Sequence, residues 1–127
     1  MNGYGDARSI AEINALLANG GVAKGKRLMS EAGCRKALEL QIEGPDLVMM
    51  GMVVRFSLGF ALPSPILRLR PPGPNTLFWA GSGGSIVPID PDARTTLAYA
   101  MNRMAPAIIG DERSFRIIRA MWQALGA

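Results

Sequence analysis

The stretch Thr76–Ala100, TLFWAGSGGSIVPIDPDARTTLAYA, decides the fold class because extended segments alternate in it with tight turns. A strand is predicted to start near its first residue, and the small residues Gly81-Ser82-Gly83-Gly84 let the backbone bend after that strand. Ser85–Ile89 resumes the extended chain and ends at the turn Asp90-Pro91-Asp92-Ala93. Thr95–Arg103 then returns as a hairpin partner. The stretch therefore predicts an antiparallel sheet.

A second extended region lies upstream. In Met52–Phe60 apolar residues recur at every second position, which predicts a strand with one apolar face. The uncharged run Leu47–Val54 is far shorter than the roughly 20 residues that cross a bilayer, so it is predicted to be a buried strand. Five prolines fall within residues 63–75 and predict an irregular surface segment there.

A first helix is predicted near the N-terminus. Asp6 or Ser9 can cap its start, and Asn19-Gly20-Gly21 supplies a left-handed C-terminal cap. The residues predicted to face inward are Ile10, Ile13, Leu16 and Leu17. Residues 22–29 are then predicted to form a short polar connection.

Two further helices are predicted. Ser30 caps a helix over Glu31–Leu40, with its inward positions at Cys34, Ala37 and Leu38. Asp111 caps an amphipathic C-terminal helix. The apolar residues at helical spacing in this last helix are Phe115, Ile118, Trp122 and Leu125.

This order of elements predicts an α+β fold, with N-terminal helices, an antiparallel sheet of about three strands and an amphipathic C-terminal helix. Residues 1–127 are expected to be a single partial domain. Within it, residues 1–45 are the end of a helical region, residues 46–110 form the sheet and residues 111–127 form the closing helix.

The composition excludes several kinds of site. The chain has no histidine and one cysteine, so it can form neither a Ser-His-Asp triad nor an internal disulfide, and neither a metal nor a cofactor is expected. The net charge is +4, but the basic residues are scattered, so no nucleic-acid partner is expected. Met1–Asp6 lacks the basic start and apolar core of a secretory signal. A cytoplasmic protein without a membrane span is therefore expected.

The segment Phe78–Ser85 is the strongest candidate for chemistry, because a strand that ends in small residues can present backbone N–H groups to a ligand. It has neither the G-x-G-x-x-G spacing of a dinucleotide site nor the G-x-S-x-G spacing of a nucleophile elbow. A glycine-rich turn without any ligand explains the same composition, so the residues alone leave both interpretations open.

Two smaller candidates are better explained by structure. Asp90 and Asp92 could form a carboxylate pair, but a turn is the favoured interpretation. Cys34 is favoured as a small residue on a helix face over a reactive thiol.

An ordered series of segments runs from residue 2 to about residue 125. These segments are Asn2–Ser9, Ala18–Gly21, Phe56–Phe60, Trp79–Ser85 followed by Asp90-Pro91, and Ala100–Met104. Together they resemble the C-terminal portion of β-lactamase-related serine hydrolases, especially the family VIII carboxylesterases. The resemblance implies a partial β-lactamase/transpeptidase-like fold and a hydrolase of the carboxylesterase type.

The resemblance also implies a site. In that family a third box on the edge strand of the sheet faces the acyl group; it is Lys-Thr-Gly in β-lactamases and often His-x-Gly or Trp-x-Gly in the esterases. Trp79, Ala80 and Gly81 resemble this box, and the backbone N–H of Ser82 would supply one half of the oxyanion hole. Trp79 would form a wall of the acyl pocket. A tryptophan in place of the cationic side chain argues for a small neutral ester over a β-lactam.

The nucleophile of that family is missing. No serine of the chain is followed by lysine three positions later, and neither Tyr4 nor Tyr99 is followed by asparagine two positions later. Without a nucleophile no acyl-enzyme forms, so the chain by itself is predicted to be inactive. The resemblance implies that it begins inside the helical part of the parent fold. A complementary N-terminal half or a homo-oligomer is the expected partner, and an ester is a substrate only of the completed site.

A different class of function also fits the sequence. A non-catalytic binding or assembly module could use an exposed sheet edge and apolar surface to dock a partner chain.

Overall fold

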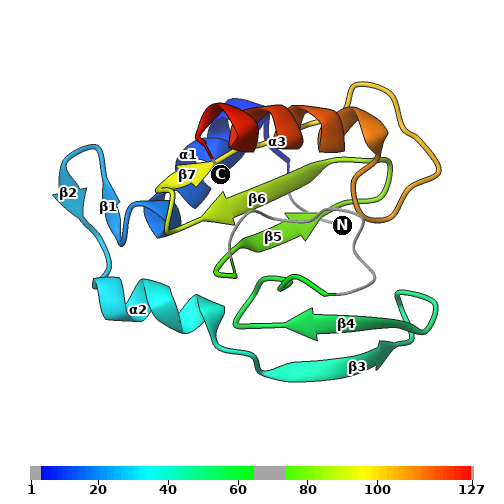
Figure 1. Ribbon diagram of the computed structural model, residues 1–127, viewed down its shortest axis with the longest axis horizontal. Coiled ribbons are helices and arrows are strands. Elements are labelled where there is room, and N and C mark those ends of the chain that lie inside the picture. Colours follow the sequence, from blue (N-terminus) through cyan, green and yellow to red (C-terminus); the bar gives the residue numbers. More distant parts are fainter. Residues whose placement is uncertain (1–3, 65–73, 127) are drawn as a thin grey trace.

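The computed structural model describes residues 4–64 and 74–126, and in these ranges helices flank antiparallel strands (Figure 1). The elements are α1 (Ala7–Ala18), β1 (Val22–Ala23), β2 (Lys26–Arg27), α2 (Glu31–Arg35), η1 (Lys36–Leu38), β3 (Ile42–Asp46), β4 (Met52–Phe56), β5 (Leu77–Ala80), β6 (Ile86–Asp90), β7 (Thr95–Thr96) and α3 (Glu112–Ala124). The predicted α+β class is confirmed. Residues 65–73, most of the predicted irregular segment, lie outside the described residues.

Side-chain caps start both long helices. The Asp6 carboxylate accepts a hydrogen bond from the Ser9 N–H at 2.7 Å, so Asp6, and not Ser9, caps α1. At α3 the Asp111 carboxylate accepts from the Ser114 N–H, and the Ser114 hydroxyl accepts from the Asp111 N–H at 2.9 Å. This reciprocal capping box satisfies donors that a helix start leaves unpaired. The predicted cap of the C-terminal helix is confirmed.

Residues 22–29 contain a hairpin in place of the predicted polar connection. β1 and β2 pair antiparallel, and the turn residues Lys24 and Gly25 have φ angles of 49° and 76°. Two positive φ angles make the turn whose twist matches a hairpin. Gly21 is required where the hairpin closes, because a Cβ there would lie 2.1 Å from the Met29 carbonyl oxygen. Two-residue strands are too short to show a period in the sequence.

The second helix is shorter than predicted. Ser30 caps α2 by accepting from the Gly33 N–H at 3.0 Å, as predicted, but the α-helix ends at Arg35 and continues as the 3₁₀ turn η1. Cys34 and Ala37 are buried, which confirms the predicted inward face.

Apart from the β1–β2 hairpin, the described strands form two sheets that meet at one residue. β3 pairs with β4 over its whole length, and β5, β6 and β7 form a second antiparallel sheet in that order. Ala61 lies between the ladders, bridged to Phe56 on one side and to Phe78 on the other. Its N–H and C=O groups bond to Phe78 at 2.9 and 3.0 Å, so the pairing is continuous but only one residue wide there.

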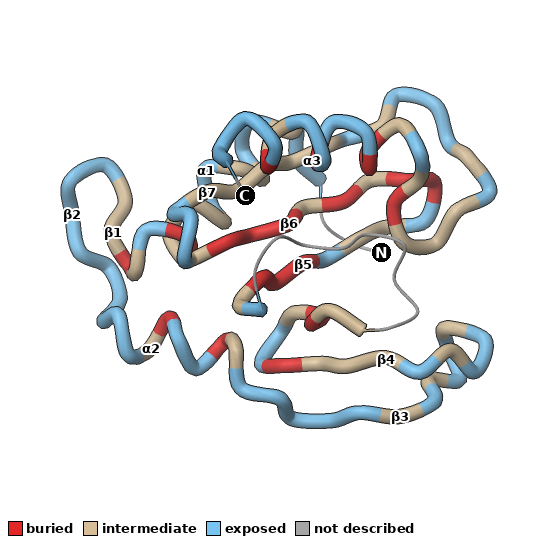
Figure 2. The backbone as a smooth tube through the Cα atoms, in the orientation of Figure 1, coloured by how far each residue is buried: buried red, intermediate tan, exposed pale blue. Residues whose placement is uncertain are grey.

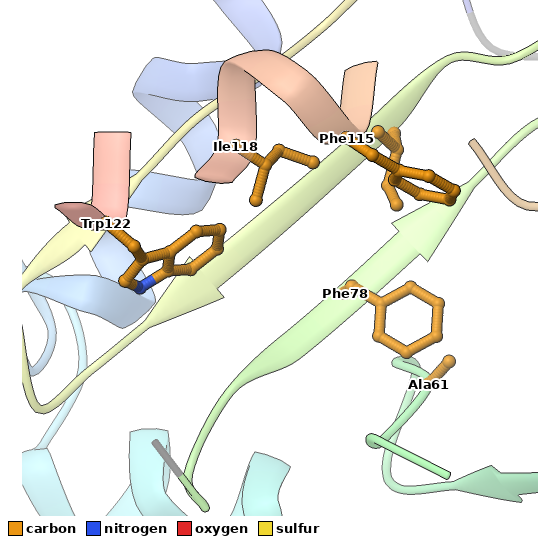
Figure 3. Close-up of a cluster of buried hydrophobic side chains, with 6 residues drawn as sticks. Ala61, Phe78, Phe115, Ile118 and Trp122 are labelled. Carbon is orange, nitrogen blue, oxygen red and sulfur yellow. The ribbon is translucent and has the colours of Figure 1, made fainter. Parts of the chain in front are cut away.

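Each face of the β5–β6 sheet packs against different helices. One cluster joins Phe115, Ile118 and Trp122 of α3 to Ala61, Phe78 and Ile86, and Figure 3 shows the three α3 side chains directed at the strands. The other cluster joins Ala18, Ala37, Leu62, Leu77 and Ile89. Successive strand residues Leu77 and Phe78 fall in different clusters, as the two-residue period requires. Figure 2 shows buried residues concentrated in β5, β6 and the inner side of α3.

The predicted buried strand over Leu47–Val54 is wrong in its first part. Residues 47–51 form the turn between β3 and β4, where Leu47 is 93% and Val48 88% exposed. The turn is closed by positive φ angles at Met50 and Gly51 and by the Asp46 carboxylate, which accepts from the Met49 N–H at 2.8 Å. All of β3 except Asp46 lies in the range 1–45, which was predicted to be the end of a helical region. Apolar composition alone did not reveal a turn made by backbone conformation.

Three other expectations need correction. The strand predicted to reach Phe60 ends at Phe56, because the Ser57 N–H turns back to the Phe60 carbonyl at 2.9 Å. The hairpin partner predicted over Thr95–Arg103 keeps pairing only as far as Tyr99, which bridges Ile86. Ile13, predicted to face inward on α1, is 73% exposed.

Candidate functional site

Trp79 stands at the end of β5, where the strand leaves the core. Phe78 is buried beneath α3, whereas Trp79 is 50% exposed. The Trp79 ring lies against Phe56 of β4, with the ring centroids 5.7 Å apart and the planes tilted by 49°. This tilted pairing is a favourable arrangement of two aromatic rings and fixes one wall of the site.

The backbone N–H of Ser82 forms no hydrogen bond with the described part of the chain. The Gly81 N–H turns back and donates to the Ser85 carbonyl at 3.0 Å, which holds the bend after β5. Ser82 is exposed, and neither its N–H nor its hydroxyl bonds to any residue in the ranges 4–64 and 74–126. An unpaired donor at a rigid strand end is the type of group that can bind a carbonyl or carboxylate oxygen.

The segment that starts α3 anchors the glycine bend. The Gly83 N–H donates to the Ala107 carbonyl at 2.8 Å, and the Gly83 carbonyl accepts from the Ala105 N–H at 2.9 Å. Gly84 has a φ of +113°, and a Cβ there would lie 2.5 Å from an Asp111 carboxylate oxygen. Only glycine allows this approach, so the bend next to Ser82 is fixed by its sequence.

An ion pair supports the same bend. Arg113 donates from Nε to the Asp111 carboxylate at 2.9 Å and from Nη1 to the Arg103 carbonyl at 2.9 Å. The hydrogen bond from Arg113, together with those from the N–H groups that start α3, holds the pKa of Asp111 below its ordinary value. The carboxylate is therefore charged at neutral pH and keeps the cap and the ion pair in place.

A cavity of about 400 Å³ lies between β4, the end of β5 and the segment before α3. All four residues predicted for the site, Trp79, Ala80, Gly81 and Ser82, line it. The other lining residues are Val48, Met49, Val54, Arg55, Phe56, Ala61, Leu62, Ser64, Phe78, Ile108 and Ile109. We call this cavity the Trp79 groove.

Most of the groove wall was not predicted from the sequence. Val54 and Phe56 were identified as one face of a strand, but nothing indicated that this strand lies beside Trp79. Ile108 and Ile109 come from an irregular segment, and the one signal for them is an apolar pair just before the predicted helix. Such contacts between distant segments have no periodic trace in a sequence.

The groove is apolar and carries little free charge. Arg55 is the one charged residue among its described lining residues, and its guanidinium is already occupied. Nε bonds to Glu43 at 3.2 Å, and Nη1 donates to the Pro63 carbonyl at 2.9 Å. Gly81 leaves further room, because a Cβ there would meet no atom within 4 Å. The groove therefore suits a neutral, partly apolar ligand better than an anion.

The other sequence candidates have structural roles. The Asp90 carboxylate accepts from the N–H groups of Asp92 and Ala93 at 3.0 and 2.9 Å and from the Trp122 indole at 3.1 Å. Asp90 thus fixes a turn and ties it to α3, which confirms the turn interpretation. Cys34 is buried. Within the described ranges no three His, Cys, Asp or Glu side chains come together as a metal site.

Comparison with known proteins gives a match at the level of solved structures. No protein-family model and no curated protein matches the chain. A family VIII carboxylesterase matches with a TM-score of 0.84 and 36% identity over 94% of this chain. A penicillin-binding protein homologue from Caulobacter crescentus matches with a TM-score of 0.83 and 32% identity over 93% of this chain. The chain is a C-terminal part of the β-lactamase-like fold.

The chain spans 31% of the length of each of these two structures. The match to the β-lactamase-like fold confirms the resemblance to β-lactamase-related proteins that was inferred from the ordered segments. Among the described residues of this part of the fold, no helix combines the length and apolar character needed to cross a membrane.

Proposed function

We propose that the chain supplies the third box and one oxyanion-hole donor to a serine hydrolase of the carboxylesterase type. The observation that supports this most strongly is the Ser82 N–H, which has no partner among the described residues and lies at the mouth of an apolar groove with Trp79. The two matched structures, a carboxylesterase and a penicillin-binding protein homologue, are consistent with acyl chemistry at such a site.

Different groove residues would contact different parts of the substrate. A backbone N–H that meets the oxyanion of a tetrahedral intermediate stabilises the transition state by about 3 to 4 kcal/mol. Trp79 and Phe56 would contact the acyl chain of a neutral ester, and Gly81 leaves space for the ester to approach the backbone. Because Arg55 is already paired, the groove offers no free cation for a substrate carboxylate. A small neutral ester is therefore the proposed substrate class.

Nucleophilic chemistry needs a group from outside these 127 residues. No serine in them has the S-x-x-K spacing, and they contain no histidine. We therefore propose that the isolated chain does not turn over esters. Turnover would require a complementary segment that carries the nucleophile, such as a separate N-terminal half, because a second copy of the same 127 residues has no S-x-x-K motif either.

One backbone substitution tests the role of the Ser82 amide. Ser82→Pro deletes the N–H, whereas the control Ser82→Ala keeps it and removes only the hydroxyl. In ¹⁵N-labelled chain, titration with ethyl butyrate should shift the Ser82 amide and the Trp79 indole resonances. The Trp79 shift should weaken strongly in S82P and persist in S82A.

The same pair tests catalysis when the chain is completed with a nucleophile-bearing segment. S82P should then lower kcat for p-nitrophenyl butyrate by roughly 10²- to 10³-fold, and S82A should stay near wild type. Equal activity of S82P and wild type would exclude the oxyanion-hole role. Ester turnover by the isolated wild-type chain would exclude the proposed need for a second segment.

A second candidate function is partner docking through the β3–β4 hairpin. Within the described residues β3 pairs only with β4, so its other edge is open, and Leu47, Val48 and Met50 at the adjacent turn are strongly exposed. Open edges and exposed apolar residues favour association. Sedimentation of the purified chain tests this: concentration-dependent dimers that Val48→Lys abolishes would support docking, and a monomer at all concentrations would exclude self-association.

A further inference from the structure

A second cavity, of about 670 Å³, lies at the other end of β6 from the Trp79 groove. It is bounded by the end of α1, the β1–β2 hairpin, α2 and the turn that follows β6, all toward one end of the molecule (Figure 1). It shares no lining residue with the groove. Its size is that of a site for a small molecule.

The lining of this cavity is rich in positive charge. Four cationic residues line it, Lys24, Arg27, Arg35 and Arg94, against two carboxylates, Glu31 and Asp92. Four positive and two negative charges give the cavity lining a net charge of +2. Like charges around a concave surface repel one another unless an anion lies between them.

Internal pairing leaves two guanidinium groups without a carboxylate. Arg35 is 3.7 Å from Glu31, and Lys24 is 3.2 Å from Glu12 outside the cavity. Arg27 and Arg94 form no ion pair with any described residue. These two arginines are the cations of the lining that remain, and together with the one remaining carboxylate, Asp92, they leave a net charge of +1.

Both arginines are placed by the backbone around them. Arg27 donates from Nη1 to the Gly20 carbonyl at 2.9 Å and to the Met29 carbonyl at 3.1 Å, which leaves Nε and Nη2 without a described partner. Arg94 lies in the turn after β6 with a φ of +50°, and the Asp90 carboxylate fixes the start of that turn. The Arg27 guanidinium, which is held by two carbonyls, therefore loses little freedom when it binds a second group.

The cavity also has an apolar side. Leu17, Val22 and Leu38 line it together with the buried residues Ala18 and Cys34. A ligand that fills it would therefore combine an anionic group with an apolar body.

We propose that this cavity binds a small organic anion whose oxyanion group, a phosphate or a carboxylate, pairs with Arg27 and Arg94 and whose apolar part covers Leu17 and Leu38. Guanidinium groups bind both kinds of oxyanion through paired N–H···O bonds. The site is independent of the Trp79 groove and of the proposed hydrolase function.

Phenyl phosphate and benzoate test this directly on the full chain, because they carry the same apolar ring and differ in the oxyanion. Calorimetric titration at low salt should show saturable binding of at least one, and the stronger of the two identifies the preferred oxyanion. In the ¹⁵N-labelled chain the amides of Val22 and Arg94 should shift, while that of Ser82 should not.

Arg94→Gln removes one guanidinium at an exposed turn position and should weaken binding by about tenfold or more. Arg116→Gln is the matched control, since Arg116 is exposed on α3, lies outside the cavity and carries the same charge. Equal weakening in both variants would show that net charge alone causes the effect, and it would overturn the proposal. Binding of neither probe to the wild-type chain, or shifts confined to Ser82, would also overturn it.

Discussion

Trp122 on α3 and Val48 in the turn between β3 and β4 are both large and apolar, but Trp122 is 4% exposed and Val48 is 88% exposed. The α3 side of the sheet contains Phe115, Ile118 and Trp122 packed on β5 and β6, and the indole N–H is bonded to Asp90. No helix of the described residues lies over the turn of the β3–β4 hairpin (Figure 2). Apolar residues thus contribute to stability here only where a second element covers them.

The largest test of this contrast is removal of the Trp122 side chain. Trp122→Ala deletes a buried ring and the hydrogen bond to Asp90, and it should lower the free energy of unfolding by about 3 to 5 kcal/mol. Urea denaturation followed by circular dichroism measures this loss. Trp122→Phe keeps most of the packing and should lose clearly less. A loss below about 1 kcal/mol for W122A would contradict the idea that α3 closes the core.

Replacing one glycine by alanine on the α3 side and one in the β3–β4 turn compares the two regions through the same substitution. Gly84→Ala places a Cβ 2.5 Å from Asp111 at a φ of +113° and should destabilise by about 2 to 3 kcal/mol. Gly51→Ala, at a φ of +81° in the hairpin turn, meets no atom within 4 Å and should lose only about 1 kcal/mol. Thermal unfolding of both variants gives the ranking. Equal losses would mean that backbone strain alone, and not the contact with Asp111, decides.

The loss of stability at acid pH should depend in part on the α3 side of the molecule. The pKa of Asp111 is lowered in the folded chain by its bonds to Arg113 and to the helix start. The charged Asp111 carboxylate therefore stabilises the fold fully when the pH is above the ordinary pKa of 3.8. This stabilisation is lost as the pH falls through the lowered pKa of the folded state.

Asp111→Asn should accordingly lower stability at pH 7 and flatten the fall in unfolding free energy at acid pH. Chemical denaturation between pH 7 and pH 2 measures this slope. Asp6 also has a lowered pKa, so part of the slope should remain. An unchanged slope in D111N would show that the ion pair does not contribute.

The smallest effect is expected at the hairpin turn. Val48→Lys places a charge where the side chain is already in water and should change the unfolding free energy by less than about 0.5 kcal/mol. Thermal denaturation of the dilute chain is the measurement. A loss above 1 kcal/mol would show that the turn is covered in solution and would remove the contrast.

The sequence predicted those parts of the fold that have local signals. Capping residues located the starts of α1, α2 and α3, a period-two pattern located β4, and the glycine bend and the turn at Asp90 located β5 and β6. The Trp79–Ser82 segment was found because small residues follow a strand, and its role came from the ordered resemblance.

What the sequence did not reveal depends on contacts between distant segments or on backbone conformation. The turn at residues 47–51 looked like a strand because its residues are apolar, and positive φ angles at Met50 and Gly51 leave no mark in hydropathy. The groove walls contributed by Phe56, Ile108 and Ile109 depend on which strand lies next to β5. The cluster around Arg27 and Arg94 joins residues 67 positions apart, the difference between 94 and 27.

Ala61 has a consequence for the groove. The hairpin that forms one wall and the sheet that carries Trp79 and Ser82 are linked through a single rung of pairing at this residue. The position of Phe56 beside Trp79 is therefore set through Ala61 and the core that buries it, and not by a continuous ladder between β4 and β5.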